Sequence, residues 1–170
     1  RLKNGDIVAV KGIGGFHLVC DARSDSALTT LRERKGRVDK PFAVMCRDAE
    51  TAAKFIEHSP VDLDLLNDRA RPIVLMQKKS SDLSLLIAPG NRLLGVMLPY
   101  SPLHYLLFDD ETDVLVMTSG NLSNEPIVRD NIDAFQKLSN LADCFLLHNR
   151  DIHVPCDDSV MRTFDPQSQI

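Results

Sequence analysis

The sequence lacks the motifs that would assign a function directly. No two of its four cysteines form a C-x-x-C pair, the spacing that makes zinc and redox sites recognisable. No run approaches the roughly 20 apolar residues of a membrane span, and no signal peptide opens the chain. A formal net charge of −4 argues against a general nucleic-acid or membrane-surface binder. We therefore expect reduced thiols, a cytoplasmic protein without a membrane partner, and at most a local basic surface for nucleic acid.

Common phosphate-binding and catalytic motifs are also missing. The glycine-rich segment at residues 11–15 fits neither the G-x-x-x-x-G-K-[ST] phosphate loop nor the G-x-G-x-x-G dinucleotide motif. No serine lies in G-x-S-x-G, which argues against a hydrolase triad. The histidines and aspartates between residues 148 and 158 lack a spacing specific to any metal, so no metal ligands are predicted there. Asp157 and Asp158 could still help to hold a Mg²⁺ ion that is bound to nucleotide phosphates.

Predicted strands and helices alternate along the whole chain. Its 170 residues, 44% of them hydrophobic, suit one domain with a full core. Apolar β-branched runs predict strands at residues 7–10, 16–20, 41–46, 72–76, 93–98, 114–117 and 144–147, with a last strand after the polar turn at 157–162. Helical spacing and capping residues predict helices at 24–36, 48–56, 61–67, 103–108 and 130–141. This alternation predicts an α/β sheet with helices packed on it.

A cluster of cations follows the first predicted helix. Lys35, Arg37 and Lys40 lie within six residues, interrupted by Gly36 and followed by Pro41. Arg37 could donate to two phosphate oxygens at once, while the two lysines would supply mobile point charges. The spacing therefore predicts an anion site suited to a di- or triphosphate. A solvated helix end, favoured by the helix dipole, is the alternative interpretation.

A second polar cluster, at residues 118–126, follows the predicted strand 114–117. Thr118, Ser119 and Asn121 offer hydroxyl and amide groups suited to phosphate or ribose. Polar side chains at strand ends are where open α/β sheets bind ligands. We expect this cluster and the cations to face one nucleotide. A binding module that holds nucleotide or double-stranded RNA without chemistry is an alternative from another functional class.

Five ordered segments resemble the YrdC-like family, and in particular the branch found in HypF, the carbamoyltransferases of NiFe-hydrogenase maturation. These segments are residues 11–18, 35–42, 95–104, 118–126 and 157–160. The resemblance implies a single YrdC-like domain over residues 1–170, excised from a longer multidomain HypF chain. It also implies a twisted mixed sheet with flanking helices and a concave basic cleft.

The resemblance further implies an enzyme that uses ATP and Mg²⁺. The HypF branch forms carbamoyl adenylate and pyrophosphate from ATP and from carbamate, which another domain releases from carbamoyl phosphate. The carbamoyl group then passes to HypE. By matched position, Lys35 and Arg37 are expected to be catalytic and nucleotide-binding, with Thr118, Ser119 and Asn121 also binding the nucleotide; Lys11, His17 and Ser159 are expected to border the substrate pocket.

One departure from the family pattern bears on the substrate. The branch that modifies transfer RNA carries an arginine before an apolar–proline pair, where it would meet the carboxylate of threonine. This chain has Met97 there. Because carbamate brings no second carboxylate, the departure favours carbamate, and threonylcarbamoyl adenylate synthesis is the alternative enzyme activity. An adenylate must be shielded from water, so the polar segment 78–82 could be a lid; a plain linker is the alternative.

Overall fold

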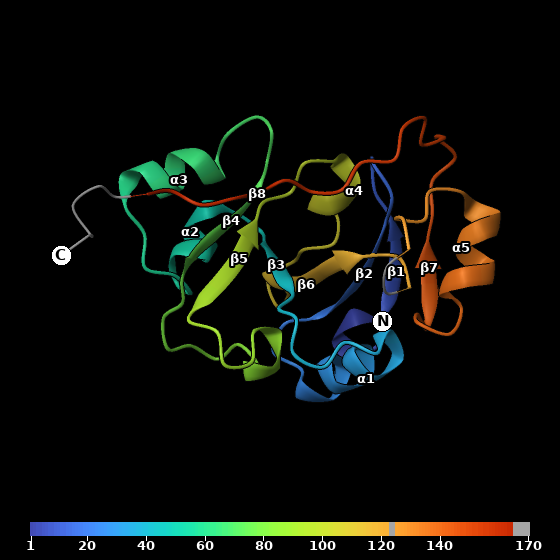
Figure 1. Ribbon diagram of the computed structural model, residues 1–170, viewed down its shortest axis with the longest axis horizontal. Coiled ribbons are helices and arrows are strands. Elements are labelled where there is room, and N and C mark those ends of the chain that lie inside the picture. The colour runs from blue at the N-terminus through green and yellow to red at the C-terminus, as the bar shows by residue number, and fades with distance from the viewer. Residues whose placement is uncertain (123–124, 165–170) are drawn as a thin grey trace.

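The computed structural model describes residues 1–122 and 125–164, which form one mixed eight-stranded sheet with helices packed against it (Figure 1). The predicted α/β class is confirmed. The strands are β1 (Val8–Lys11), β2 (Phe16–Asp21), β3 (Ala43–Cys46), β4 (Ile73–Gln77), β5 (Leu93–Met97), β6 (Val114–Ser119), β7 (Cys144–Leu146) and β8 (Val160–Met161). The helices are η1 (Leu2–Asn4), α1 (Asp25–Lys35), α2 (Ala49–Ala53), α3 (Pro60–Leu66), η2 (Leu85–Ile87), α4 (Pro102–Tyr105) and α5 (Asn131–Leu138).

Helix α1 begins and ends where its capping residues predict. The Ser24 side chain accepts a hydrogen bond from the Ala27 backbone N–H, at 3.2 Å. At the other end, Gly36 takes a left-handed conformation with φ 59°, which a glycine adopts at little cost. The chain therefore turns sharply after Lys35, and residues 37–40 follow directly on the C-terminal end of the helix.

Several predicted boundaries differ from the structure. Helices α2, α4 and α5 are shorter than the predicted ranges 48–56, 103–108 and 130–141. Helix α2 stops early because Ile56, fully buried, pairs instead with Lys78 in an isolated β-bridge. The 3₁₀ helices η1 and η2 were not predicted. Within the described residues no helix is long and apolar enough to span a membrane.

The strand order is β7-β1-β2-β6-β3-β5-β4-β8. Strand β6 is antiparallel to both β2 and β3, while the pairs β3–β5, β1–β7 and β4–β8 are parallel. In Figure 1, β7 and α5 lie at one end of the molecule and α3 lies at the other. Because β6 lies in the middle of this order, its polar end pairs with β2, and Ser119 lies opposite His17.

The two faces of the sheet are covered unequally. One face carries the larger core, to which α1 contributes Leu28 and Leu31. The other face has a smaller core of buried residues, against which Tyr100 and Leu103 pack. The segment that runs from β5 through α4 therefore covers part of this second face.

A row of residues crosses β6, β3 and β5 beside the smaller core. Ala43 of β3 pairs with Met117 of β6 on one side and with Gly95 of β5 on the other. Side chains at directly paired positions share one face of a sheet. Two of these three residues are very small, so the row leaves room above the sheet.

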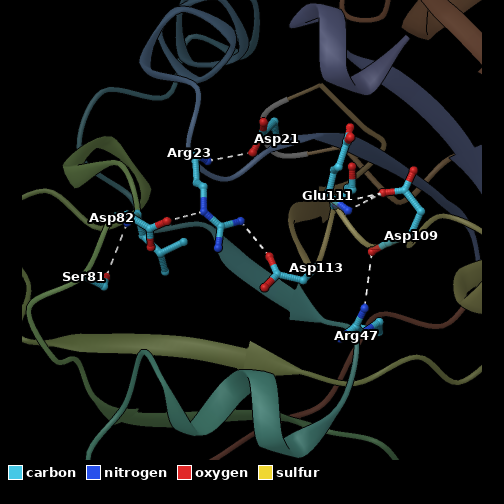
Figure 2. A network of polar contacts seen from close by, with 10 residues as sticks. Asp21, Arg23, Arg47, Ser81, Asp82, Asp109, Glu111 and Asp113 are labelled. Carbon is cyan, nitrogen blue, oxygen red and sulfur yellow. Dashed lines mark hydrogen bonds and ion pairs between the residues drawn. The ribbon is translucent and has the colours of Figure 1, made fainter.

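Arg23, just after β2, ties the polar segment 78–82 to the sheet (Figure 2). Its guanidinium donates to Asp82 and, at 2.7 Å, to Asp113. The Lys79 backbone N–H also bonds the Phe55 carbonyl, at 2.8 Å. Residues 78–81 line a cavity with Phe55 and Leu94. These contacts support the linker interpretation of the segment over the lid.

Candidate functional site

The two polar clusters predicted to face one ligand lie in direct contact. Lys35 Nζ donates to the Ser119 carbonyl at 2.6 Å, to the Asn121 carbonyl at 3.1 Å and to Asn121 Oδ1 at 3.2 Å. Lys35 is only 6% exposed, so a solvated helix end does not describe it. Its ammonium group thus joins the end of α1 to the segment that follows β6.

Arg37 also lies where the end of α1 meets β6 and the segment after it, here called the junction. Its Nη1 donates to Thr118 Oγ1 at 2.9 Å, its Nε donates to the Lys40 carbonyl at 3.1 Å, and its Nη2 donates to the Pro41 carbonyl. The guanidinium carbon lies 4.7 Å from the centroid of the Phe42 ring, within cation–π range. A guanidinium carries five N–H groups, so these three bonds leave donors for a ligand oxygen.

The segment after β6 is organised by its own side chains. The Ser119 hydroxyl donates to Asn121 Oδ1 at 2.8 Å, and Asn121 Nδ2 donates to the Glu125 carbonyl at 2.7 Å. The Gly120 N–H bonds the Phe16 carbonyl, and a Cβ at residue 120 would lie 2.7 Å from that oxygen. Glycine is therefore required at 120 for this approach. Ser123 and Asn124, which belong to the predicted polar cluster, lie outside the described residues.

Two cavities open at this junction. The first, here the loop cavity, has a volume of about 350 Å³ and is lined by residues 35–40 with Ser119 and Asn121. The second, here the floor cavity, has a volume of about 530 Å³ and shares Arg37, Lys40 and Ser119 with the first. It also includes the paired row Ala43, Gly95 and Met117, together with Asp157 and Asp158. Since carboxylates line these cavities as well, the concave basic cleft stays a prediction.

Burial and neighbouring positive charges lower the pKa values of Lys35 and Arg37. Burial, then the charges of Arg37 and Lys40, lower the pKa of Lys35 to about 8. Burial, then the charge of Arg32, lowers the pKa of Arg37 to about 10. An anion bound between them would relieve both effects, because it would restore a favourable environment for the charged forms. Such perturbed groups at a cavity are typical of functional sites.

The lowered pKa of Lys35 predicts a pH-dependent affinity for ATP. Bound phosphate stabilises the ammonium form and raises its pKa, so above pH 8 binding requires uptake of a proton. The ATP dissociation constant should therefore rise about tenfold per pH unit between pH 8 and the pKa of the complex. Calorimetric titrations from pH 7.5 to 9.5 would measure this. Lys35→Arg, which keeps its charge, should show no such rise; a parallel rise in that variant would contradict the assignment.

The lowered pKa of Lys35 has the opposite effect on folding: as the pH rises, ATP affinity falls but the stability of the fold increases. The ordinary pKa of a lysine is 10.5, so between about pH 8 and 10.5 the unfolded chain binds more protons at Lys35 than the folded one. The contribution of Lys35 to the free energy of unfolding therefore rises with pH across this window. Affinity and stability should move in opposite directions there.

Arg32 is a residue of the site that the sequence analysis missed. It is 8% exposed, and its guanidinium carbon lies 4.6 Å from the Phe42 ring centroid. Its side chain donates to the backbone carbonyls of Leu86 at 2.7 Å, Arg37 at 2.9 Å, Val38 at 2.8 Å, Lys40 at 3.4 Å and Ile87 at 3.3 Å. Arg32 thus fixes the backbone of residues 37–40, here called the cation segment. In the sequence it is one more basic residue of a helix, and nothing local marks it.

The three residues predicted for the substrate pocket lie in different places. His17 Nε2 lies 2.8 Å from Asp158 Oδ2, and Asp158 lines the floor cavity. Ser159 lies just before β8, and its carbonyl accepts from the Ile73 N–H at 2.8 Å. Lys11 is buried and donates, at 3.4 Å, to the carbonyl of His148. His148 lines a separate cavity, so these contacts connect His17, but not Lys11, with the cations.

This fold and site define a class of protein. The Sua5/YciO/YrdC family model, described as telomere recombination, matches residues 1–170, and the chain belongs to this family. The most informative curated relative is carbamoyltransferase HypF of Rhodobacter capsulatus. It is 54% identical over 166 residues, which are 98% of this chain and 22% of the relative. The predicted resemblance to the YrdC-like domain of HypF is confirmed.

Solved structures and a second relative complete the comparison. A full-length HypF in a phosphate- and nucleotide-bound form is 54% identical, with a TM-score of 0.92 over 95% of this chain and 26% of that chain. Threonylcarbamoyl-AMP synthase of Mus musculus is 30% identical over 127 residues, which are 74% of this chain and 45% of the relative. The chain thus spans about a fifth of the length of the curated HypF relatives it matches.

Proposed function

We propose that this chain forms carbamoyl adenylate and pyrophosphate from ATP and carbamate. The observation that carries the proposal is the junction of Lys35 and Arg37 with Thr118 and Ser119 at the wall of two adjoining cavities. Clustered cations beside hydroxyl and amide groups suit a triphosphate. The nucleotide- and phosphate-bound HypF relative supports the choice of ligand.

The chemistry asks for positioning and charge rather than for a protein nucleophile. A carbamate oxygen attacks the α-phosphorus of ATP, the bond from that phosphorus to the oxygen bridging the β-phosphate breaks, and pyrophosphate leaves. Lys35 and Arg37 would orient the triphosphate and stabilise the charge that develops on pyrophosphate. Mg²⁺ bound to the phosphates would supply further charge neutralisation, with phosphate and water oxygens among its ligands.

The environment of Met97 supports carbamate as the acid. Met97 is fully buried in the smaller core, where Met45 pairs with it across β3 and β5. At this position the side chain offers no cation to a second carboxylate, which threonine would bring. Threonylcarbamoyl adenylate formation remains the second candidate, favoured by the similarity to threonylcarbamoyl-AMP synthase.

The proposal extends to a larger protein. The chain spans about a fifth of its HypF relatives, and we propose that residues 1–170 are one domain of such a multidomain chain. Other domains would release carbamate from carbamoyl phosphate and pass the carbamoyl group to HypE. Pyrophosphate exchange distinguishes this proposal from a nucleotide- or RNA-binding module, which would catalyse no exchange.

The proposal predicts exchange of label between pyrophosphate and ATP. With Mg²⁺, ATP and carbamate supplied from an ammonium bicarbonate solution, labelled pyrophosphate should enter ATP. Carbamoyl phosphate should not replace carbamate, because the phosphatase step is assigned to another domain. Exchange that requires threonine instead would favour the second candidate. ATP binding without any exchange would favour the binding module.

A further inference from the structure

Asp158 is a carboxylate in the wall of a cavity that also contains Arg37 and Lys40. Its side chain is 22% exposed, and its Oδ2 lies 2.8 Å from His17 Nε2. Burial acts to raise its pKa, but the hydrogen bond and the charge of His17, with a smaller contribution from Tyr100, outweigh that effect and the pKa is lowered. Asp158 is therefore ionised and accepts hydrogen bonds only. Because a carboxylate repels phosphate, Asp158 is not suited to bind a phosphate oxygen directly.

The neighbours of Asp158 hold it in place. Since Asp158 can only accept, His17 Nε2 carries the hydrogen of their bond. His17 is 3% exposed, and a Cβ at Gly12 would lie 3.2 Å from its Nδ1. His104 packs edge-on against both rings, with centroids 4.4 Å from Tyr100 and 6.1 Å from His17. The result is a carboxylate acceptor with a fixed direction.

His104 adds no competing charge to this cluster. It is fully buried, and neither of its ring nitrogens bonds a residue that the structure describes. Burial, then the nearby His17, lowers the pKa of His104 to about 4, so its ring is neutral near pH 7. His104 therefore does not offset the negative charge of Asp158, which accepts hydrogen bonds beside the cations that would hold phosphate.

We propose that Asp158, positioned by His17 and Tyr100, accepts hydrogen bonds from the amino group of carbamate and so selects an acid that carries N–H groups. This inference rests on the proposed function and names the recognition element within it. An acid with a methyl group in place of the amino group, such as acetate, would leave the carboxylate unpaired. Sites built to bond a substrate N–H reject analogues that lack it far more strongly than apolar pockets do.

A magnesium ligand is the competing role for Asp158. Asp157 and Asp158 both line the floor cavity, and carboxylates are suitable ligands for Mg²⁺. A Mg²⁺ ion bound to substrate phosphates needs only one or two protein carboxylates, so this role competes directly with the proposed one. The hydrogen bond between His17 and Asp158 suits either role, and the experiment separates the two.

The test uses two stable acyl-sulfamoyl adenosines that differ in one group. N-carbamoyl-sulfamoyl adenosine presents an amino group, and N-acetyl-sulfamoyl adenosine presents a methyl group of similar size. By calorimetry the unsubstituted chain should bind the first about 10- to 100-fold more tightly. Asp158→Asn should remove most of this preference and leave the dissociation constant of Mg²⁺-ATP unchanged. His17→Gln, which keeps an N–H donor, should retain more of the preference than His17→Leu.

Asp64→Asn, a substitution at an exposed carboxylate on α3, is the matched control and should keep the full preference. Equal affinity of the unsubstituted chain for the two analogues would overturn the inference. So would an Asp158→Asn variant that binds both analogues and Mg²⁺-ATP more weakly by one common factor, the result expected of a magnesium ligand. A preference for the carbamoyl analogue in a chain without exchange activity would support Asp158 and contradict the proposed function, so the two failures are distinguishable.

Discussion

Replacing Arg37 with alanine is expected to lower carbamate-dependent ATP–pyrophosphate exchange by about 100- to 1,000-fold, the usual effect of removing one preorganised donor from a developing charge. Arg37 combines a cavity position with donors left over from its bonds to Thr118, Lys40 and Pro41. Lys35→Met should cause a loss of similar size, because it removes the buried ammonium group that lines the loop cavity beside Arg37. Initial exchange rates at saturating ATP would measure both.

Arg34→Ala is the matched control for these variants. Arg34 lies on the same helix end, but it donates to Asp143 Oδ1 at 2.8 Å and to the Leu141 carbonyl at 3.3 Å. Removing it takes away one cation of α1 without touching either cavity, so exchange should stay near that of the unsubstituted chain. An equal loss in all three variants would attribute the effect to net charge or helix stability and contradict the site assignment.

Arg32→Lys is expected to loosen the cation segment and the fold together. An ammonium group cannot bond five carbonyls from the position of a planar guanidinium. Losing two or so of these charged hydrogen bonds should cost about 2–4 kcal/mol, which lowers the melting temperature of a chain of this size by about 5–15 °C. ATP should bind about tenfold more weakly, because Arg37 and Lys40 lose their backbone anchor.

A core variant tells positioning apart from general destabilisation. Leu31 is fully buried on the same helix, and Leu31→Ala should cost about 2–5 kcal/mol without touching residues 37–40. Its ATP affinity, measured well below its melting temperature, should match that of the unsubstituted chain. If both variants lose affinity in proportion to their stability, Arg32 acts on the fold alone.

Local signals explain which parts of the fold could be predicted. Helix α1 follows from Ser24, the spacing of its leucines and Gly36, all within one short stretch of sequence. The strands follow from apolar runs, since each run must be buried on at least one face. The strand order does not follow, because the position of β6 between β2 and β3 depends on pairings across about 100 residues.

The candidate site also has a part that could be predicted from local sequence and a part that depends on contacts between distant residues. The site residues were predicted from residue type and resemblance, and the structure places Lys35 in contact with Ser119 and Asn121. It places Arg37 in contact with Thr118. Their roles in catalysis stay predictions. Asp158 could not be paired with His17 from the sequence, because 141 residues separate them.

The most direct test of the central claim is mass spectrometry of the product formed from ATP, Mg²⁺ and ¹³C-labelled carbamate. The account predicts a labelled carbamoyl adenylate, formed together with pyrophosphate and absent from reactions of the Arg37→Ala variant. Release of ADP and phosphate, or a labelled adenylate that appears only when threonine is added, would contradict it.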